Sequence, residues 1–324
     1  MEGHLPRSDD RPAWEALGED PLFRHALEHP ILTTHGIVTR IFNPHFMGRG
    51  GVVHFEPGIG TQTDSPDGRL LVRALCEVIE HPIVTTDSRW FSPHGLVGDA
   101  RNRLTIFREL GIEHVRAVGV SAGALRSLVM GQEDAATRIL QSIDTYSLPL
   151  QTKILHRDRA KRFLELLAFY FDEAVDTIDL PPGVLMEKQL YRSYYGKDPL
   201  SNPRAIHAFK AFVNSIKPGL ADDLSLQDMN PRKIISMFMR GWGIVDASDP
   251  ESVKKLRQGL RLRMVVGEKD RFTNFQDHID AADIRNNAHP GSCTVEILTD
   301  EGHSYLRDHR LLAKRIAAGL SEAA

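Results

Sequence analysis

The sequence predicts an α/β fold in which a mostly parallel central sheet is flanked by helices and carries an inserted, all-helical cap. Two observations predict it. In both terminal parts of the chain, short β-rich runs alternate with runs of helical period, which is the pattern of a parallel sheet covered by helices. From about residue 148 to 254 only helical periods occur, broken by Pro and Gly, which favours a cap over one end of the sheet. We therefore expect an N-terminal extension (1–34), a core made of 35–147 and 255–324, and a cap (148–254).

The composition excludes several classes of protein. The chain has 324 residues, of which 41% are hydrophobic and 26% charged, and no stretch approaches the roughly 18 apolar residues of a membrane span. A net charge of −3 without a Lys/Arg block gives no footprint for nucleic acid. The two cysteines, Cys76 and Cys293, are far apart, so we expect neither a disulfide framework nor a metal site. Because residues 1–20 are polar and lack a secretory signal, we expect a cytoplasmic protein. With no basic patch for nucleic acid, a small molecule is the expected partner.

The first part of the core predicts five strands and the helices between them. The expected strands are short, apolar and rich in β-branched residues, and they cover 36–42, 51–58, 82–87, 114–120 and 137–146. Apolar residues at helical spacing predict helices over 65–81 and 98–111, the second ending at Gly111. A further helix should follow the fourth of these strands directly.

The last part of the chain repeats the alternation. Strands are predicted within 260–270 and 293–303, with a helix between them, and the run "LLAKRIAAGL" (311–320) predicts a closing helix. The sheet is therefore expected to continue on the far side of the cap insertion.

One serine stands at the junction of a predicted strand and helix, in "AVGVSAGALRS" (117–127). Gly119 and Gly123 flank Ser121 in a G-x-S-x-G pattern, and a sharp strand-to-helix turn crowds both neighbours of its central residue. Such a turn lifts the hydroxyl clear of the sheet and aims the first amides of the helix at a reacting carbonyl. Ser121 is therefore a candidate nucleophile, although a tight turn without chemistry would fit the same letters.

The stretch "VGVSAGAL" resembles the nucleophile elbow of the α/β-hydrolase superfamily, and residues 99–124 resemble the helix, strand and elbow of that family almost end to end. The resemblance covers roughly 35–146 and 258–320 and leaves the helical insert as a variable lid. It implies a serine hydrolase that needs no cofactor and whose triad follows the order Ser, acid, His.

The acid is expected just after the strand in "LRMVVGEKDRFT", where Asp270 follows Gly267 and resembles the acid turn of the family. Its role would be to accept the imidazole N–H and to stabilise the imidazolium. Glu268 and Asp277 are close rivals, and Asp144 occupies a second position used in some relatives.

The base is expected in "CTVEILTDEGHSYL", where His303 follows the last strand in a loop before the closing helix. The chain has 15 histidines, so position rather than residue type singles this one out. His309 is a weaker candidate, because we expect it within or at the start of the closing helix.

The oxyanion hole should use the amide of Ala122 and one amide from the loop "FEPGIGTQTDSP". The family usually has His-Gly here, whereas this chain has Glu56, Pro57 and Gly58. Gly58 can stand for the family's glycine, which would make the Ile59 amide the second donor, with Gly60 as the alternative.

The cap is rich in large apolar side chains, which favours an apolar acyl chain or aromatic group in the pocket over a sugar or phosphate. The resemblance also places Trp90 and Phe91 where relatives contribute a pocket wall, ordinary packing being the alternative for both.

The function predicted is hydrolysis of a carboxylic ester, thioester or related acyl substrate through an acyl-enzyme. Two alternatives stay open. The same triad could serve acyl transfer or lyase chemistry, and the fold could belong to a slow or non-catalytic ligand-binding protein. The substrate, the pathway and assembly into a homo-oligomer are also left open by the sequence.

Overall fold

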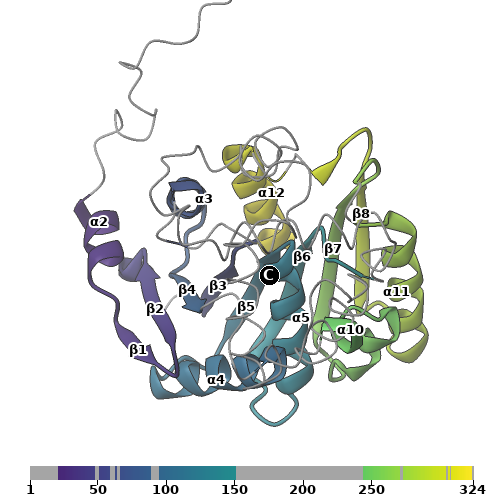
Figure 1. Ribbon diagram of the computed structural model, residues 1–324, viewed down its shortest axis with the longest axis horizontal. Helices are drawn as coiled ribbons and strands as arrows, with labels where there is room; N and C mark the ends of the chain where they lie inside the picture. Colours follow the sequence, from purple (N-terminus) through teal and green to yellow (C-terminus); the bar gives the residue numbers. More distant parts are fainter. Residues whose placement is uncertain are drawn as a thin grey trace, which may run out of the picture.

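The computed structural model describes residues 21–47, 51–58, 63, 66–88, 95–150, 244–270, 273–303, 306 and 308–322. Its centre is an eight-stranded sheet of order β1-β2-β4-β3-β5-β6-β7-β8, which runs from left to right in Figure 1. The strands are β1 (Leu32–Thr34), β2 (Ile37–Phe42), β3 (Val52–Glu56), β4 (Ile83–Ser88), β5 (Val115–Val120), β6 (Leu140–Tyr146), β7 (Arg261–Gly267) and β8 (Cys293–Leu298).

The sheet is mixed but mostly parallel. β2 pairs antiparallel with both β1 and β4, and every pairing from β4 through β3, β5, β6 and β7 to β8 is parallel. Parallel strands need crossover connections, which the helices between them supply. The predicted fold class is confirmed, and each strand predicted for the core is present.

Helices cover both faces of the sheet. One face carries α4 (Gly95–Glu109), α5 (Ala122–Glu133) and α11 (Phe275–Ala288), and the other carries α3 (Pro66–Val78) and α12 (His309–Glu322), which pack against each other. Successive strand residues alternate between the two cores: Val52, Val115 and Ala117 lie in the first, and Val53 and Val118 in the second. Each face of the central strands is therefore buried against a helical layer, as expected for a parallel sheet covered by helices.

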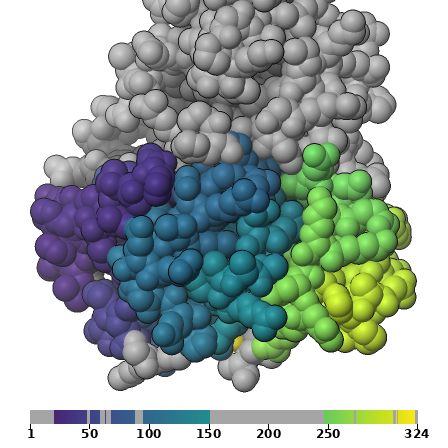
Figure 2. Space-filling model, turned by 90° about the horizontal axis from the view of Figure 1, so that it is seen from below, coloured from purple at the N-terminus to yellow at the C-terminus, as the bar shows by residue number. Residues whose placement is uncertain are grey.

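The segment 21–34, assigned to an N-terminal extension, contains structure of its own. Helix α2 (Pro21–Glu28) buries Phe23 and Leu27, and the Phe23 ring lies 5.2 Å from that of Phe42 on β2. Strand β1 then extends the sheet by one position at its edge. Figure 2 shows this N-terminal part in purple at one side of the molecule and the last segments in yellow at the other.

The predicted cap lies almost entirely outside the described residues. From its start only 148–150 are described, and Leu148 and Leu150 are buried. From its end the structure describes α10 (Ile244–Ala247) and a short 3-10 helix, η6 (Pro250–Lys255), both of which pack against α5. A second 3-10 helix, η1 (Pro44–Phe46), follows β2.

Candidate active site

Ser121 lies between β5 and α5, at the carboxyl edge of the sheet. Its backbone has φ 53° and ψ −119°, a conformation that non-glycine residues rarely adopt. The Ser121 amide donates to the Tyr146 carbonyl over 2.7 Å, and the Ala124 amide donates to the Ser121 carbonyl over 2.9 Å. The strained turn is thus fixed on both sides, to the next strand and to the new helix.

Close backbone packing explains the two glycines around this serine. A Cβ on Gly119 would collide with the carbonyl oxygen of Gly123, and a Cβ on Gly123 would collide with the carbonyl oxygens of Glu56 and Pro57. Gly123 therefore lets the start of α5 lie directly against the end of β3. The start of α5 and the end of β3 are therefore in van der Waals contact. The two oxyanion donors were predicted from α5 and from the loop after β3.

Asp270 follows β7 at the same edge, and its side chain is fully buried. Donors to its carboxylate include the Ser147 hydroxyl (2.7 Å to Oδ2), His303 Nδ1 (2.8 Å to Oδ2) and the Thr273 amide (3.1 Å to Oδ1). These hydrogen bonds hold the carboxylate in one orientation.

His303 follows β8, and its side chain is 17% exposed. Because a carboxylate only accepts hydrogen bonds, Nδ1 is the ring nitrogen that carries the proton, which leaves Nε2 as the acceptor in the neutral ring. That tautomer is the one a general base requires.

The loops that carry the acid and the histidine are tied together by their backbones. The Glu268 amide donates to Leu298 over 3.0 Å, and the Lys269 amide donates to Glu301 over 2.7 Å. Gly267 makes this approach possible, since a Cβ there would lie 2.5 Å from the Glu301 carbonyl oxygen. The Asp270–His303 pair is therefore set by main-chain contacts as well as by its own hydrogen bond.

The rival residues lie elsewhere. Glu268 is exposed and accepts from the Asp300 amide, and Asp277 accepts from Asn274 within the first turn of α11. Asp144 is buried on β6, where its charge acts on Arg263. His309 is the first residue of the closing helix α12, as predicted. Among these carboxylates and Asp270, it is Asp270 that makes the 2.8 Å hydrogen bond with His303 Nδ1.

Several predicted positions fall outside the described residues: Ile59, Gly60, Trp90 and Phe91. Gly58 is buried and ends the described part of the loop after β3. Ala122 is the first residue of α5, where a helix amide has no acceptor within its own helix.

A buried ionic cluster lies beneath this loop, and its centre is Glu56, the residue that departs from the family pattern. The Glu56 carboxylate, fully buried on β3, contacts Arg103 of α4 and lies 3.6 Å from Nη1 of Arg126 on α5. It also accepts from the Thr86 hydroxyl of β4 over 3.0 Å. One carboxylate thus joins the end of β3 to the neighbouring strand β4 and to two helices of one face, α4 and α5.

His54 completes the cluster from two residues earlier on β3. Its Nε2 lies 2.7 Å from the Thr86 hydroxyl and 3.4 Å from Glu56. Burial lowers the pKa of His54 to about 4, against the attraction of Glu56. Burial by itself would raise the pKa of Glu56, but the positive charge of Arg103 and the other neighbours bring it below its ordinary value. At neutral pH the histidine is therefore neutral and the glutamate charged.

A second anchor holds the far end of the same loop. Thr63 donates to Asp87 Oδ1 from its amide (3.0 Å) and its hydroxyl (2.9 Å), and Arg40 donates to Asp87 Oδ2 over 2.8 Å. Thr63, in the segment between β3 and α3, is therefore tied to the end of β4, as Glu56 ties the end of β3 to its neighbours.

Solved structures with this architecture include several hydrolases. The chain superposes with a TM-score of 0.53 and 14% identity on MGS-M2, an α/β-hydrolase enzyme from a Medee basin deep-sea metagenome library, over 89% of this chain and 93% of that one. A thermophilic esterase from Thermogutta terrifontis, with malate bound, matches with a TM-score of 0.51 and 12% identity over 89% and 93%. A membrane phospholipase A, described as a bacterial virulence factor, matches with a TM-score of 0.53 and 12% identity over 91% and 86%.

These likenesses establish the fold: the chain has the α/β-hydrolase fold across most of its length. No protein-family model matches the sequence, and no curated protein matches it. In the part of the chain that the structure describes, no helix is long and apolar enough to cross a bilayer, and no group of three or more potential ligands is placed to hold a metal ion.

Sequence reasoning missed the residues that support the site. No sequence motif surrounds Ser147. Its position directly after β6, at the edge where Ser121 and Asp270 lie, could have indicated it. Arg103 and Arg126 belong to different helices, and nothing in their spacing indicates that both meet one carboxylate on β3.

Proposed function

We propose that the protein is a serine hydrolase that cleaves a carboxylic ester, thioester or related acyl substrate. Ser121 is the nucleophile, His303 the general base and then the general acid, and Asp270 the residue that orients His303. The amides of Ala122 and of Ile59, the residue after Gly58, bind the oxyanion. The observation that carries the proposal is the Asp270–His303 hydrogen bond of 2.8 Å, on the edge of the sheet where Ser121 occupies a strained turn.

The sheet itself supports the grouping of these three residues. β5, β6, β7 and β8 are parallel and adjacent, so the residues that follow β5, β7 and β8 emerge at one edge. The strained Ser121 turn matches what a nucleophile elbow requires. Esterase and phospholipase activities among proteins of the same fold agree with an acyl substrate, although fold alone does not choose between chemistries.

In the proposed reaction, His303 Nε2 removes the Ser121 proton as Oγ attacks the substrate carbonyl. The tetrahedral oxyanion is held by the two amides, and the imidazolium gives its proton to the leaving alcohol or thiol as the acyl-enzyme forms. Water, activated by the same histidine, then releases the acid and frees the serine. The cap (148–254), together with Trp90 and Phe91, would form an apolar pocket for the acyl group.

Labelling with a fluorophosphonate probe tests the proposal. The wild-type protein should be labelled covalently, Ser121→Ala should abolish the labelling, and His303→Ala should slow it by at least about 1,000-fold. Ser127→Ala, which changes a buried serine further along α5, is the matched control and should label at the wild-type rate. Labelling that persists in Ser121→Ala would refute the assignment of the nucleophile.

A further inference from the structure

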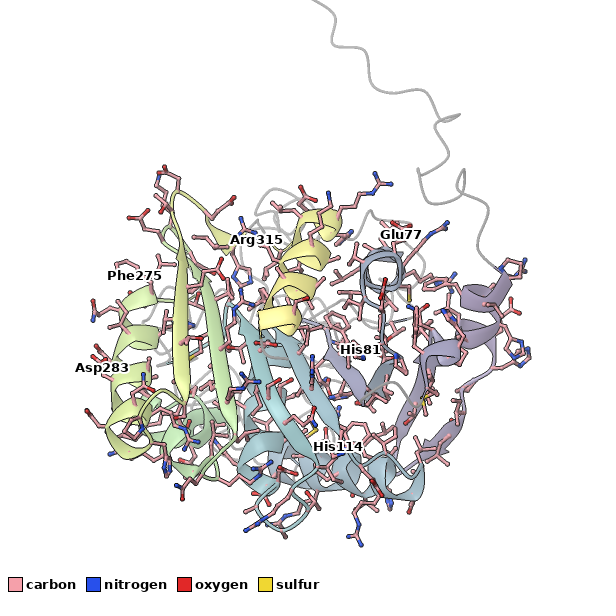
Figure 3. The ribbon with its side chains drawn as sticks, turned by 180° about the vertical axis from the view of Figure 1, so that it is seen from behind. Glu77, His81, His114, Phe275, Asp283 and Arg315 are labelled. Carbon is pink, nitrogen blue, oxygen red and sulfur yellow. The ribbon has the colours of Figure 1, made fainter. Side chains whose placement is uncertain are left out.

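A hollow of about 510 Å³ lies at the amino edge of the sheet, where β5, β6 and β7 begin. β6 has seven residues, so this edge is roughly 20 Å from the edge that carries Ser121. His114, labelled in Figure 3, directly precedes β5 and forms part of the wall of the hollow. In Figure 2 the teal segment that includes β5 and β6 borders directly on the green segment around β7.

The wall of the hollow is strongly basic. Of the nine described residues that line it, none is acidic and five carry a guanidinium or an imidazole, namely His114, Arg116, Arg138, Arg257 and Arg261. This concentration stands out in a chain whose net charge is −3. A concave site lined by one sign of charge attracts ions of the other sign.

Three of these residues form a row across the sheet. Arg116 on β5 and Arg261 on β7 are both register partners of Ser142 on β6, so the two arginines flank this serine on one face. Neighbouring strands lie about 4.8 Å apart, which places the two arginine Cα atoms roughly 10 Å from each other. The Arg116 side chain also donates to the Leu320 carbonyl near the end of α12 over 2.9 Å, which fixes its position.

Two loops add the remaining cations. Arg257 is held in place by Asp134 Oδ2, at 3.0 Å, and by the Leu140 carbonyl. Arg138 is exposed, and no partner of its guanidinium is found among the described residues. The hollow therefore combines positioned guanidinium groups with at least one whose hydrogen-bonding capacity is unused.

Ser142 gives an independent indication of a ligand. It is only 4% exposed, and its hydroxyl has no hydrogen-bond partner within the described part of the chain, although the residue lines the hollow between the two arginines of the row. Buried hydroxyls in folded proteins normally have a partner. A bound anion would supply an acceptor at this position.

We infer that this hollow, formed by the Arg116–Ser142–Arg261 row together with Arg138, binds a small molecule that carries a di- or triphosphate group. Several cationic positions around one concavity favour linked phosphates over a single anion, and guanidinium groups match phosphate oxygens in pairs. The limited volume of the hollow, about 510 Å³, and the absence of a Lys/Arg block in the sequence favour a small molecule over a nucleic acid. The inference is independent of the proposed hydrolase activity.

Titration with sodium tripolyphosphate at constant ionic strength, followed by thermal unfolding and calorimetry, tests the inference. Saturating tripolyphosphate should raise the Tm of the wild-type protein by about 2–5 °C. Arg138→Gln and Arg261→Gln should each raise the Kd by about tenfold, and Ser142→Ala by a few-fold. Arg24→Gln, which changes an exposed arginine of α2 outside the hollow, should bind as the wild type does.

Folding of the variants can be checked separately, because Arg138 and Arg261 are exposed and their variants should keep the unliganded Tm within about 1 °C. No Tm shift in the wild-type protein would overturn the inference, and so would a shift that survives the Arg138→Gln, Arg261→Gln double change. Tighter binding of a short RNA than of tripolyphosphate, with the same arginine dependence, would replace the small molecule by a nucleic acid.

Discussion

The hydroxyl of Ser147 donates to Oδ2 of Asp270 over 2.7 Å, the same oxygen that His303 Nδ1 contacts at 2.8 Å. Ser147 is itself held by its backbone, which has φ 52° and whose amide donates to Val265 over 2.7 Å. The carboxylate is therefore aimed at the imidazole by a residue that is anchored between β6 and β7. We assign Ser147 as a positioning residue for the proposed acid.

Changing Ser147 to Ala should lower kcat for a p-nitrophenyl ester by about tenfold, because a hydrogen bond to a charged group is lost and the carboxylate gains freedom to turn. KM should change little, since Ser147 acts through Asp270 rather than on the substrate. Steady-state kinetics separates the two parameters.

Ser147→Thr retains the hydroxyl and should restore most of kcat. A loss that is equal in the Ala and Thr variants, or one that appears in KM alone, would show that Ser147 contributes only packing.

Replacing Asp270 by Asn should reduce kcat by roughly 10³- to 10⁴-fold, because the amide favours the wrong imidazole tautomer. Glu268→Gln is the matched control: it removes a carboxylate from the same turn, but an exposed one that accepts from the Asp300 amide. Its kcat should stay within about twofold of wild type. Equal losses in the two variants would contradict the assignment of the acid.

The sheet was predictable because it rests on local patterns, and the candidate site residues were proposed from the same patterns. Runs such as 114–120 are apolar and β-branched and are bounded by turn residues, so each strand is visible without the others. Ser121, Asp270 and His303 each follow such a run, and parallel strands bring their carboxyl ends to one edge.

What was missed depends on long-range contacts. Glu56 was seen only as a departure from the family pattern, because its partners Arg103 and Arg126 come from two helices that lie 47 and 70 positions further along the chain. Strand β1 was missed because three residues of ordinary composition carry no period, and their pairing with β2 is decided by the sheet edge.

Gly123→Ala should destabilise the protein by about 3 kcal/mol, because the new Cβ would collide with the carbonyl oxygens of Glu56 and Pro57. Gly36→Ala is the control: Gly36 has φ 73° but nothing within 4 Å of the added Cβ, so only the backbone cost of about 1 kcal/mol applies. Urea unfolding measures both changes. If Gly123→Ala costs no more than Gly36→Ala, β3 and α5 do not pack as closely as the structure indicates.

The buried His54 should make the protein lose stability as the pH falls from 7 to 5. Its folded pKa of about 4 lies below the ordinary value of 6.5, so in this range the unfolded chain binds a proton that the folded chain does not. Stability is therefore complete above pH 6.5 and declines towards pH 4, by about 2 kcal/mol between pH 7 and 5. The lowered pKa of Glu56 contributes only below about 4.5, its ordinary value, so it does not enter this window.

His54→Gln should flatten the decline by about the same 2 kcal/mol, as measured by urea unfolding at pH 7 and pH 5. His278 and His81 also have pKa values lowered by burial, so part of the pH dependence should persist in the variant. His45→Gln, which changes an exposed histidine, should unfold with the wild-type pH dependence. A pH dependence that is as steep in His54→Gln as in the wild type would mean that protonating His54 costs the folded state little, and that the cluster around Glu56 accommodates a charged imidazole.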